Sequence, residues 1–228
     1  MTIVDVRDAE AFLARLTRLD PAALVRLRPG TPDPVGAPRV GLWARLPWDV
    51  LVTRGVRGEV PGDATVRAAD LLARLAGDVA DLPPRRDAEW RWPLPPGAGR
   101  AVESVAAAEL RRVAAAAAGT LREAASSGIG GRSVGERAVR DALLDHVAIV
   151  VTADTGERVE VAQRLVQAVV QMGFLGAAES TASGESPAAL AQVRLAGRWV
   201  GIAAPYGTAW SRSPGELAVR PVADRTNG

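Results

Sequence analysis

Residues 133–156 read SVGERAVRDALLDHVAIVVTADTG and predict a helix, a strand and a turn in that order. Ser133 and Glu136 match the S-x-x-E capping box, in which two side chains satisfy backbone N–H groups at the start of a helix. Apolar residues such as Val139 and Leu143 then recur at helical spacing. The β-branched run at 147–152 predicts a buried strand, and Gly156 is typical of the turn that ends it.

The residues that follow predict a second helix and a β-hairpin. Apolar spacing indicates a helix over about 161–172, and Gly173 suits its C-terminal end. Residues 192–195 and 199–202 flank a turn that contains Gly197, as in a hairpin. This order is close to that of a winged helix. We therefore predict an α+β fold, with antiparallel strands or hairpins covered by helices and a winged-helix-like C-terminal part.

In a winged helix, the second of these helices would contact DNA. Its polar residues are spaced by four, so they lie in one row on the helix surface. Gln can pair with adenine, and Arg can pair with guanine or with phosphate. Polar residues also occupy ordinary solvated helix faces, so both interpretations stay open. The candidate contacts to nucleic acid or to a protein partner are Arg158, Gln163, Arg164, Gln167 and Gln171.

The N-terminal part predicts a helix, three strands and a second helix. This order resembles the double-stranded-RNA-binding domain. That family has a basic cluster at the start of its last helix, whereas residues 62–70 here read GDATVRAAD, with one Arg and two Asp. The departure puts RNA binding by this region in doubt.

We divide the chain into four parts. Residues 1–97 form the N-terminal part, 98–132 a long Ala-rich helix with a glycine hinge, 133–222 the winged-helix-like part, and 223–228 a disordered tail. The motifs ALVRL at 23–27 and VGL at 40–42 resemble AQVRL at 191–195 and VGI at 200–202. This resemblance suggests an internal helix–hairpin repeat.

The composition bounds the class of protein. The chain has 228 residues, 48% of them hydrophobic, which is enough for a substantial core. No apolar run approaches the ~20 residues of a membrane helix, and the first residues lack a signal-peptide pattern. We predict a soluble, cytoplasmic protein. All 28 basic residues are Arg, which together with many Ala, Gly and Pro is typical of a high-GC bacterial genome.

The charge pattern favours a protein partner over nucleic acid. The net charge is only +2, and the signs are interspersed along the sequence. Proteins that bind duplexes usually concentrate positive charge on one face. We therefore expect a protein partner or self-association, with nucleic acid as the less favoured partner.

Several chemistries are excluded by residues that the chain lacks. Without Cys there is no thiol nucleophile and no Cys zinc site, and without Lys there is no Schiff base and no P-loop lysine. The one His, His146, follows a predicted helix and lacks a nucleophile motif. The carboxylates Asp154, Glu157 and Glu160 match no EF-hand spacing. We predict no catalytic residue, no metal site and no cofactor.

Tryptophan is unusually common: six Trp stand beside one Tyr and two Phe. Trp with Arg is typical of interface hot spots and of anion-binding clefts, although Trp can also fill a core. We predict a non-catalytic protein that binds another macromolecule through an Arg/Trp surface and the winged-helix-like region. The alternative is an anion-binding protein or enzyme with a cleft between hairpins. The residues predicted to line that cleft are Trp43, Arg45, Trp48, Trp90, Trp92, Arg198 and Trp199.

Overall fold

The computed structural model describes residues 1–77, 79–127, 136–153, 155–177 and 189–212. The helices are α1 (Val6–Leu19), α2 (Ala68–Ala76), α3 (Ala107–Ser127), α4 (Glu136–Asp145) and α5 (Gln163–Gln171), with a short 3-10 helix η1 (Asp87–Glu89). The strands are β1 (Thr2–Ile3), β2 (Leu24–Pro29), β3 (Arg39–Arg45), β4 (Leu51–Glu59), β5 (Ala64–Arg67), β6 (Arg100–Ala106), β7 (Val147–Thr152), β8 (Arg158–Ala162), β9 (Leu190–Ala196), β10 (Trp199–Ala204) and β11 (Gly207–Arg212).

Some sequence predictions fall outside the described residues. They are the capping residue Ser133, the glycine hinge at 128–132, Asp154 in the predicted turn, and the tail at 223–228.

The strands form one large antiparallel sheet and one separate hairpin. The large sheet has nine strands in the order β5-β2-β3-β4-β11-β10-β9-β6, with β1 added beside β4. β7 and β8 pair with each other as a two-stranded sheet. The prediction of a mixed α+β fold with an antiparallel sheet and several helices is therefore confirmed.

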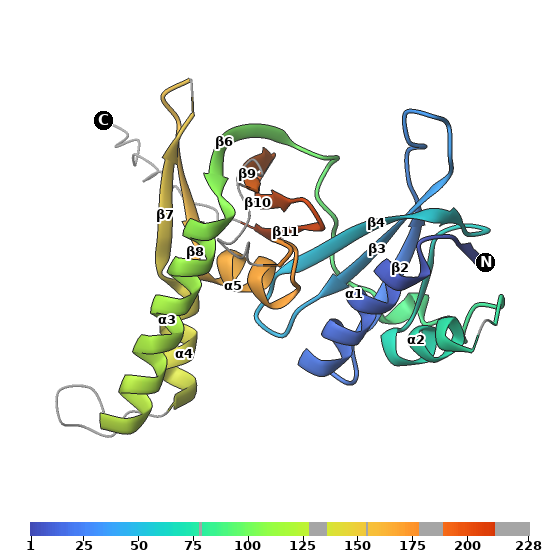
Figure 1. The fold of residues 1–228 in the computed structure, drawn as a ribbon, viewed down its shortest axis with the longest axis horizontal. Helices are drawn as coiled ribbons and strands as arrows, with labels where there is room; N and C mark the ends of the chain where they lie inside the picture. Colours follow the sequence, from blue (N-terminus) through green and yellow to red (C-terminus); the bar gives the residue numbers. More distant parts are fainter. Residues whose placement is uncertain (78, 128–135, 154, 178–188, 213–228) are drawn as a thin grey trace, which may run out of the picture.

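Alternating side chains give the large sheet two different faces. On β3, Val40, Leu42 and Ala44 are buried on the core face, under the helices, while Trp43 and Arg45 lie on the outer face. The helices bury their apolar stripes on the core face: Phe12 of α1 stacks on Phe174, which follows α5, with ring centroids 6.3 Å apart. Figure 1 shows α1 and α2 beside β2–β4, and α3 running alongside α4.

The ladder of the large sheet repeats itself about an approximate twofold axis. Gly41 of β3 and Gly201 of β10 are counterparts, because the neighbouring strand places Arg28 opposite the first and Arg194 opposite the second. On the next strand of each half, the same correspondence relates Thr53 of β4 to Thr208 of β11. Thr53 and Thr208 are also direct cross-strand partners. The axis of the sheet therefore passes through this pair, where the two halves join.

The connections to the helices follow the same correspondence. β5 continues into α2 and β6 continues into α3. The first residue of each helix donates its backbone N–H to the carbonyl of the residue that precedes the neighbouring strand. Ala68 donates to the Ala23 carbonyl at 3.0 Å, and Ala107 donates to the Ala189 carbonyl at 2.8 Å. The VGL and VGI motifs are in register, whereas the ALVRL and AQVRL motifs are two residues out of register in the ladder.

The winged-helix arrangement is not confirmed. The predicted C-terminal hairpin is β9–β10, which lies within the nine-stranded sheet and is not a separate wing. A further strand, β8, immediately precedes α5 and pairs with β7. α5 itself is packed against β10, β11, α3 and α4, so it does not stand out from the surface. Within the described part of the chain, no helix is both long and apolar enough to span a membrane.

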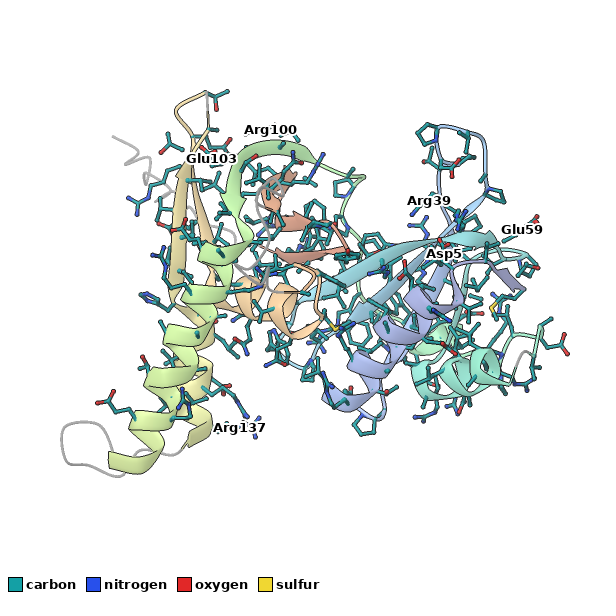
Figure 2. The ribbon with its side chains drawn as sticks, viewed as in Figure 1. Asp5, Arg39, Glu59, Arg100, Glu103 and Arg137 are labelled. Carbon is teal, nitrogen blue, oxygen red and sulfur yellow. The ribbon has the colours of Figure 1, made fainter. Side chains whose placement is uncertain are left out.

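Charged groups lie on opposite sides of the molecule in Figure 2, with Asp5, Arg39 and Glu59 near the start of β3 and the end of β4, and Arg100 and Glu103 on β6. Asp5 accepts hydrogen bonds from the backbone N–H and the guanidinium of Arg57. These bonds hold the pKa of the Asp5 carboxyl below its usual value.

Candidate binding groove

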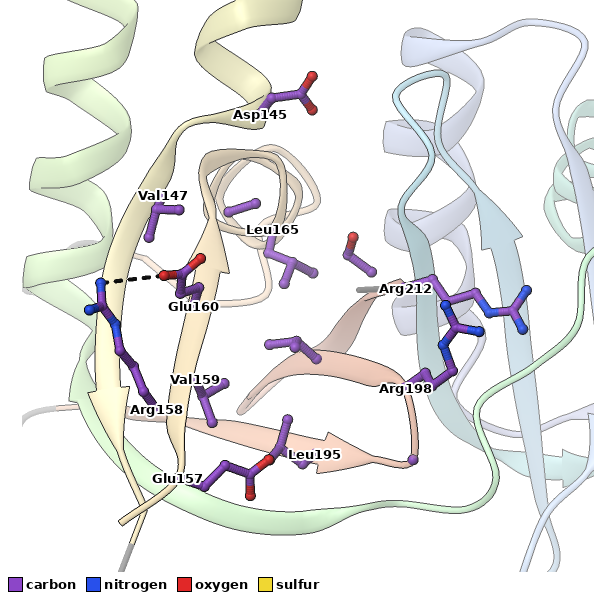
Figure 3. Close-up of a pocket in the computed structure, with 14 residues that line it drawn as sticks. Asp145, Val147, Glu157, Arg158, Val159, Glu160, Leu165, Leu195, Arg198 and Arg212 are labelled. Carbon is purple, nitrogen blue, oxygen red and sulfur yellow. Dashed lines mark ion pairs between the residues drawn. The ribbon is translucent and has the colours of Figure 1, made fainter. Parts of the chain in front are cut away.

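A cavity of about 690 Å³ lies between the β7–β8 hairpin and the end of the large sheet (Figure 3). We call it the groove. One side is formed by β8 and the residues before it, and the other by β9, β10 and β11. Its lining residues are Asp145, Val147, Glu157, Arg158, Val159, Glu160, Ala162, Leu165, Leu195, Gly197, Arg198, Val200, Ser211 and Arg212.

The floor of the groove is apolar and is an uncovered part of the core. In the twofold register, Val200 corresponds to Val40, and Ser211 corresponds to Val56. Val40 and Val56 are fully buried, within the core against which Ile3 of β1 packs. Val200 and Ser211 are only partly buried and face the groove. The second half of the sheet therefore leaves open a surface that the first half covers.

The strand β8 presents one edge without a strand partner among the described residues. It pairs through Arg158–Ala162 with β7 alone, and four of its five residues line the groove together with Glu157. In the first half, the strand that precedes α1 is β1, which pairs with β4 through Ile3 and Gly58. An unpaired strand edge offers backbone donors and acceptors to an added strand.

The carboxylates of the groove are already neutralised. Glu160 pairs with Arg158 at 3.3 Å. Glu157 forms an ion pair with Arg100 of β6, and Asp145 forms one with Arg164. Each of these carboxylates therefore has an arginine partner among the described residues.

Arg198 and Arg212 differ from the other charged residues of the groove. Arg198 directly precedes Trp199, which is the cross-strand partner of Arg212. The Arg212 guanidinium lies over the Trp199 ring at 6.0 Å. Neither arginine forms an ion pair with any residue in the described ranges, and both are exposed. Figure 3 shows both side chains on the wall opposite β8.

The described residues that line the groove include one hydroxyl side chain, that of Ser211, and no His. Across the described residues, no cluster of His, Cys, Asp and Glu could hold a metal ion. The arrangement is suited to binding a segment with both apolar and charged groups.

The predicted cleft residues come together mostly in a second, smaller core on the outer face of the sheet. Trp199 and Trp210 are buried there with Leu51, and Trp43, Trp90 and Trp92 pack against them. The segment that contains Trp90 and Trp92 crosses this face, and their rings meet edge to face at 5.6 Å.

Arginines surround this outer cluster. Arg45 lies over Trp92 at 4.8 Å, and Arg26 lies over Trp90 at 5.7 Å. Burial lowers the pKa of the Arg45 guanidinium. A second cavity, of about 280 Å³, touches this cluster only through Trp90. The tryptophans thus pack against one another, and the groove contains none of them.

Trp48 and Arg198 lie apart from this cluster. Trp48 follows β3 and packs on the main core, where its Nε1–H donates to the carbonyl of Arg164 at 3.3 Å. Arg198 lies at the turn between β9 and β10 and lines the groove.

The residues predicted on a DNA-contacting helix are not presented as a row. Gln163 is buried, with 4% of its surface exposed, because α5 packs against the sheet. Gln167 and Gln171 are partly buried. Arg164 bonds to Asp145 and to the carbonyl of Trp48, and Arg158 pairs with Glu160 in the groove. Of these five residues, only Arg158 lines the groove.

A sequence profile for a domain of unknown function, DUF8185, matches residues 94–216, more than half of the chain. The chain belongs to the DUF8185 family. All lining residues of the groove, from Asp145 to Arg212, fall in the part that matches DUF8185. A second profile, for the domain of unknown function DUF8010, matches residues 3–92. No curated protein matches the sequence.

Among solved structures, this DUF8185 chain is similar to bacterial DNA polymerase clamps. For the DNA polymerase III subunit beta of Pseudomonas aeruginosa, the identity is 12% over 95% of this chain and 64% of that chain, with a TM-score of 0.49. For the Helicobacter pylori beta clamp in complex with 5-chloroisatin, the values are 11%, 97%, 66% and 0.49. The chain spans less than two thirds of the length of each of these proteins. Similarities of this size do not assign a function to this DUF8185 chain.

Proposed function

We propose that this chain is a non-catalytic module that binds a segment of another protein in the groove. The observation that carries this proposal is the unpaired edge of β8 beside an apolar floor formed by Val159, Leu165, Leu195 and Val200. A strand edge supplies backbone hydrogen bonds, and adjacent pockets for side chains supply specificity. An extended peptide fits both features.

The neighbouring charges support a protein partner over nucleic acid. Three carboxylates, Asp145, Glu157 and Glu160, line the same groove as the arginines. Carboxylates beside a phosphate backbone are repulsive, whereas a peptide can place an apolar side chain on the floor and leave these ion pairs intact. DNA binding through α5 is not supported by the burial of Gln163.

A peptide-display selection tests the proposed function. Phage-displayed random nine-residue peptides are selected on the wild-type chain, and the isolated peptides are then measured against Val200→Arg by fluorescence anisotropy. The long charged side chain fills the floor, so we expect binding to fall at least tenfold. Peptides that bind wild type and Val200→Arg equally would place binding elsewhere and refute the proposal.

Two controls separate loss of binding from loss of structure. Thermal melting compares Val200→Arg with wild type. Ser211→Arg fills the groove from the neighbouring strand, and the two variants are expected to reduce binding alike if the groove is the site. Arg18→Gln changes an exposed residue of α1 that does not line the groove, so binding is expected to be unchanged.

A further inference from the structure

We propose that Arg198 and Arg212 together bind a carboxylate of the partner segment, so that the groove selects an extended peptide with an acidic side chain beside an apolar one. This inference rests on the proposed function and adds the chemical class of the partner. It concerns two residues on one wall of the groove, at the turn and the final strand of the β9–β11 meander.

The charges of the groove do not balance on its two walls. Its three carboxylates are each paired with an arginine, Arg158, Arg100 or Arg164. Two positive charges then remain on the opposite wall, on Arg198 and Arg212, with no carboxylate partner among residues in the described ranges. Two neighbouring guanidinium groups repel each other, and a bound anion removes that repulsion.

Trp199 holds the two arginines in place. Arg212 is the last described residue of β11, opposite Trp199, and its guanidinium lies over the Trp199 ring. Trp199 is buried against Trp210 and Leu51, so the ring gives Arg212 a fixed support. Arg198 is attached to the same residue through the backbone. A planar guanidinium that is already oriented can bind a carboxylate with little further loss of side-chain entropy.

The apolar floor adjoins the two arginines. Val200 lies two residues after Arg198, and Ser211 precedes Arg212 on β11. Side chains alternate along a strand, so Val200 and Ser211 face the groove, whereas Arg212 lies on the outer face with its cross-strand partner Trp199 and reaches the groove only at its edge, where β11 ends. An extended peptide that adds to β8 can place an apolar residue on the floor and an acidic residue at this edge.

The test uses the peptides selected on the wild-type chain. We expect Asp or Glu to be enriched at one position, next to an apolar residue. The double variant Arg198→Gln/Arg212→Gln should bind these peptides at least tenfold more weakly, because charge-assisted hydrogen bonds are lost. Replacing the acidic peptide residue by its amide should weaken binding to wild type by a similar factor and have little effect on the double variant. The pairing also predicts that binding to wild type weakens as salt is raised.

The outcomes separate this inference from the proposed function. If selected peptides lose affinity for Val200→Arg but show no acidic preference and bind the double variant normally, the carboxylate site is wrong while the groove remains the binding site. If they bind Val200→Arg normally, the proposed function itself fails. Arg18→Gln is the matched control for removal of a positive charge. Both substituted arginines are exposed, so the double variant should melt like wild type.

Duplex DNA and the chain's own C-terminal segment are two other possible sources of the anion that binds Arg198 and Arg212. If labelled duplex DNA binds the wild-type chain, and the double variant does not bind it, while no peptide is selected, the anion is phosphate and the inference is overturned. A chain that ends at Arg212 is compared with the full chain. If removal of residues 213–228 leaves the affinity of the acidic peptides unchanged, the arginines are available to a partner. If it raises that affinity more than tenfold, the anion held in the full chain belongs to its own C-terminal segment, and the partner assignment is overturned.

Discussion

Trp48 and Arg164 belong to different halves of the chain and bond to each other through two hydrogen bonds. The indole Nε1–H of Trp48 donates to the Arg164 carbonyl at 3.3 Å, and the Arg164 guanidinium donates to the Trp48 carbonyl at 3.4 Å. Trp48 lies in the turn between β3 and β4, and Arg164 lies in the first turn of α5. This contact therefore fastens the first half of the sheet to the helix of the second half.

Trp48→Ala should lower the free energy of unfolding by about 2–4 kcal/mol, because a partly buried ring and its hydrogen bond are both lost. Trp48→Phe keeps most of the apolar contact and should cost less, about 1 kcal/mol. Urea denaturation followed by circular dichroism measures both. Equal stability of wild type and Trp48→Ala would show that this contact does not hold the halves together.

Arg54 of β4 makes a second contact between the two halves. Its side chain is 12% exposed, pairs with Asp8 of α1 at 2.6 Å and donates to the Tyr206 carbonyl at 2.7 Å. Arg54→Lys retains the charge but lacks the planar fork, so we expect a loss of about 1–3 kcal/mol. A double-mutant cycle with Asp8→Asn should give a coupling energy clearly above zero. If the effects of the two single substitutions on the free energy of unfolding simply add, the pairing of Arg54 with Asp8 is contradicted.

Gly201 should not tolerate even a methyl group. A Cβ at this position would lie 2.4 Å from a carbon of the Trp210 ring, which is itself buried. Gly201→Ala should therefore destabilise the chain by about 1–3 kcal/mol, since the indole must move. Gly119 of α3 is the control, because a Cβ there meets nothing within 4 Å. Gly119→Ala should instead stabilise by about 0.5–1 kcal/mol, as read from thermal melts of the two variants.

Acid should weaken the fold through Asp5 and Asp87. Hydrogen bonds from Arg57 lower the pKa of Asp5, and the Thr65 backbone N–H, followed by Arg85, lowers the pKa of Asp87. A carboxyl with a lowered folded-state pKa contributes stability at higher pH, and that contribution is lost as the pH falls through the folded pKa. The loss should occur below about pH 4.

The variants Asp5→Asn and Asp87→Asn test this acid dependence. Each should be less stable than wild type at pH 7 and should lose less stability between about pH 4 and pH 2. Denaturant titrations at a series of pH values give the comparison. If the stability of a variant falls with acid as steeply as that of wild type, the replaced carboxyl does not contribute to the acid dependence.

The sequence predicted the helices and strands whose apolar residues follow a regular pattern over a short stretch of chain. The apolar periodicity around Phe12 and Leu16 predicted α1. The run at 147–152 predicted β7, but the expectation that this strand is buried was wrong, because β7 pairs only with β8 in a separate hairpin and Val147 and Val150 are exposed. β8 was missed, although Val159 and Val161 alternate with exposed residues, because the predicted second helix was extended over its end. The burial of Gln163 could not be predicted, since a polar row looks the same whether the helix is exposed or packed.

The groove could not be predicted from the sequence at all. Its walls come from segments near residues 145, 160, 198 and 212, and their proximity depends on how the strands are ordered. The pairing of Glu157 with Arg100 joins residues far apart in the chain, so the surplus of positive charge at Arg198 and Arg212 becomes visible only in three dimensions. Tryptophan abundance indicated a cluster, but only the fold shows that the cluster is packed.

The pair Thr53 and Thr208 has a consequence for how the chain holds itself together. Only three ladder positions join β4 to β11, with Thr53, Val52 and Leu51 on one side. Such a short seam resembles a contact between two subunits that happen to be covalently tied. The segment between α2 and β6, whose Trp90 and Trp92 pack on the outer cluster, keeps the two halves at a high effective concentration. A protein cut within that segment would become an ordinary bimolecular complex, whose integrity depends on dilution.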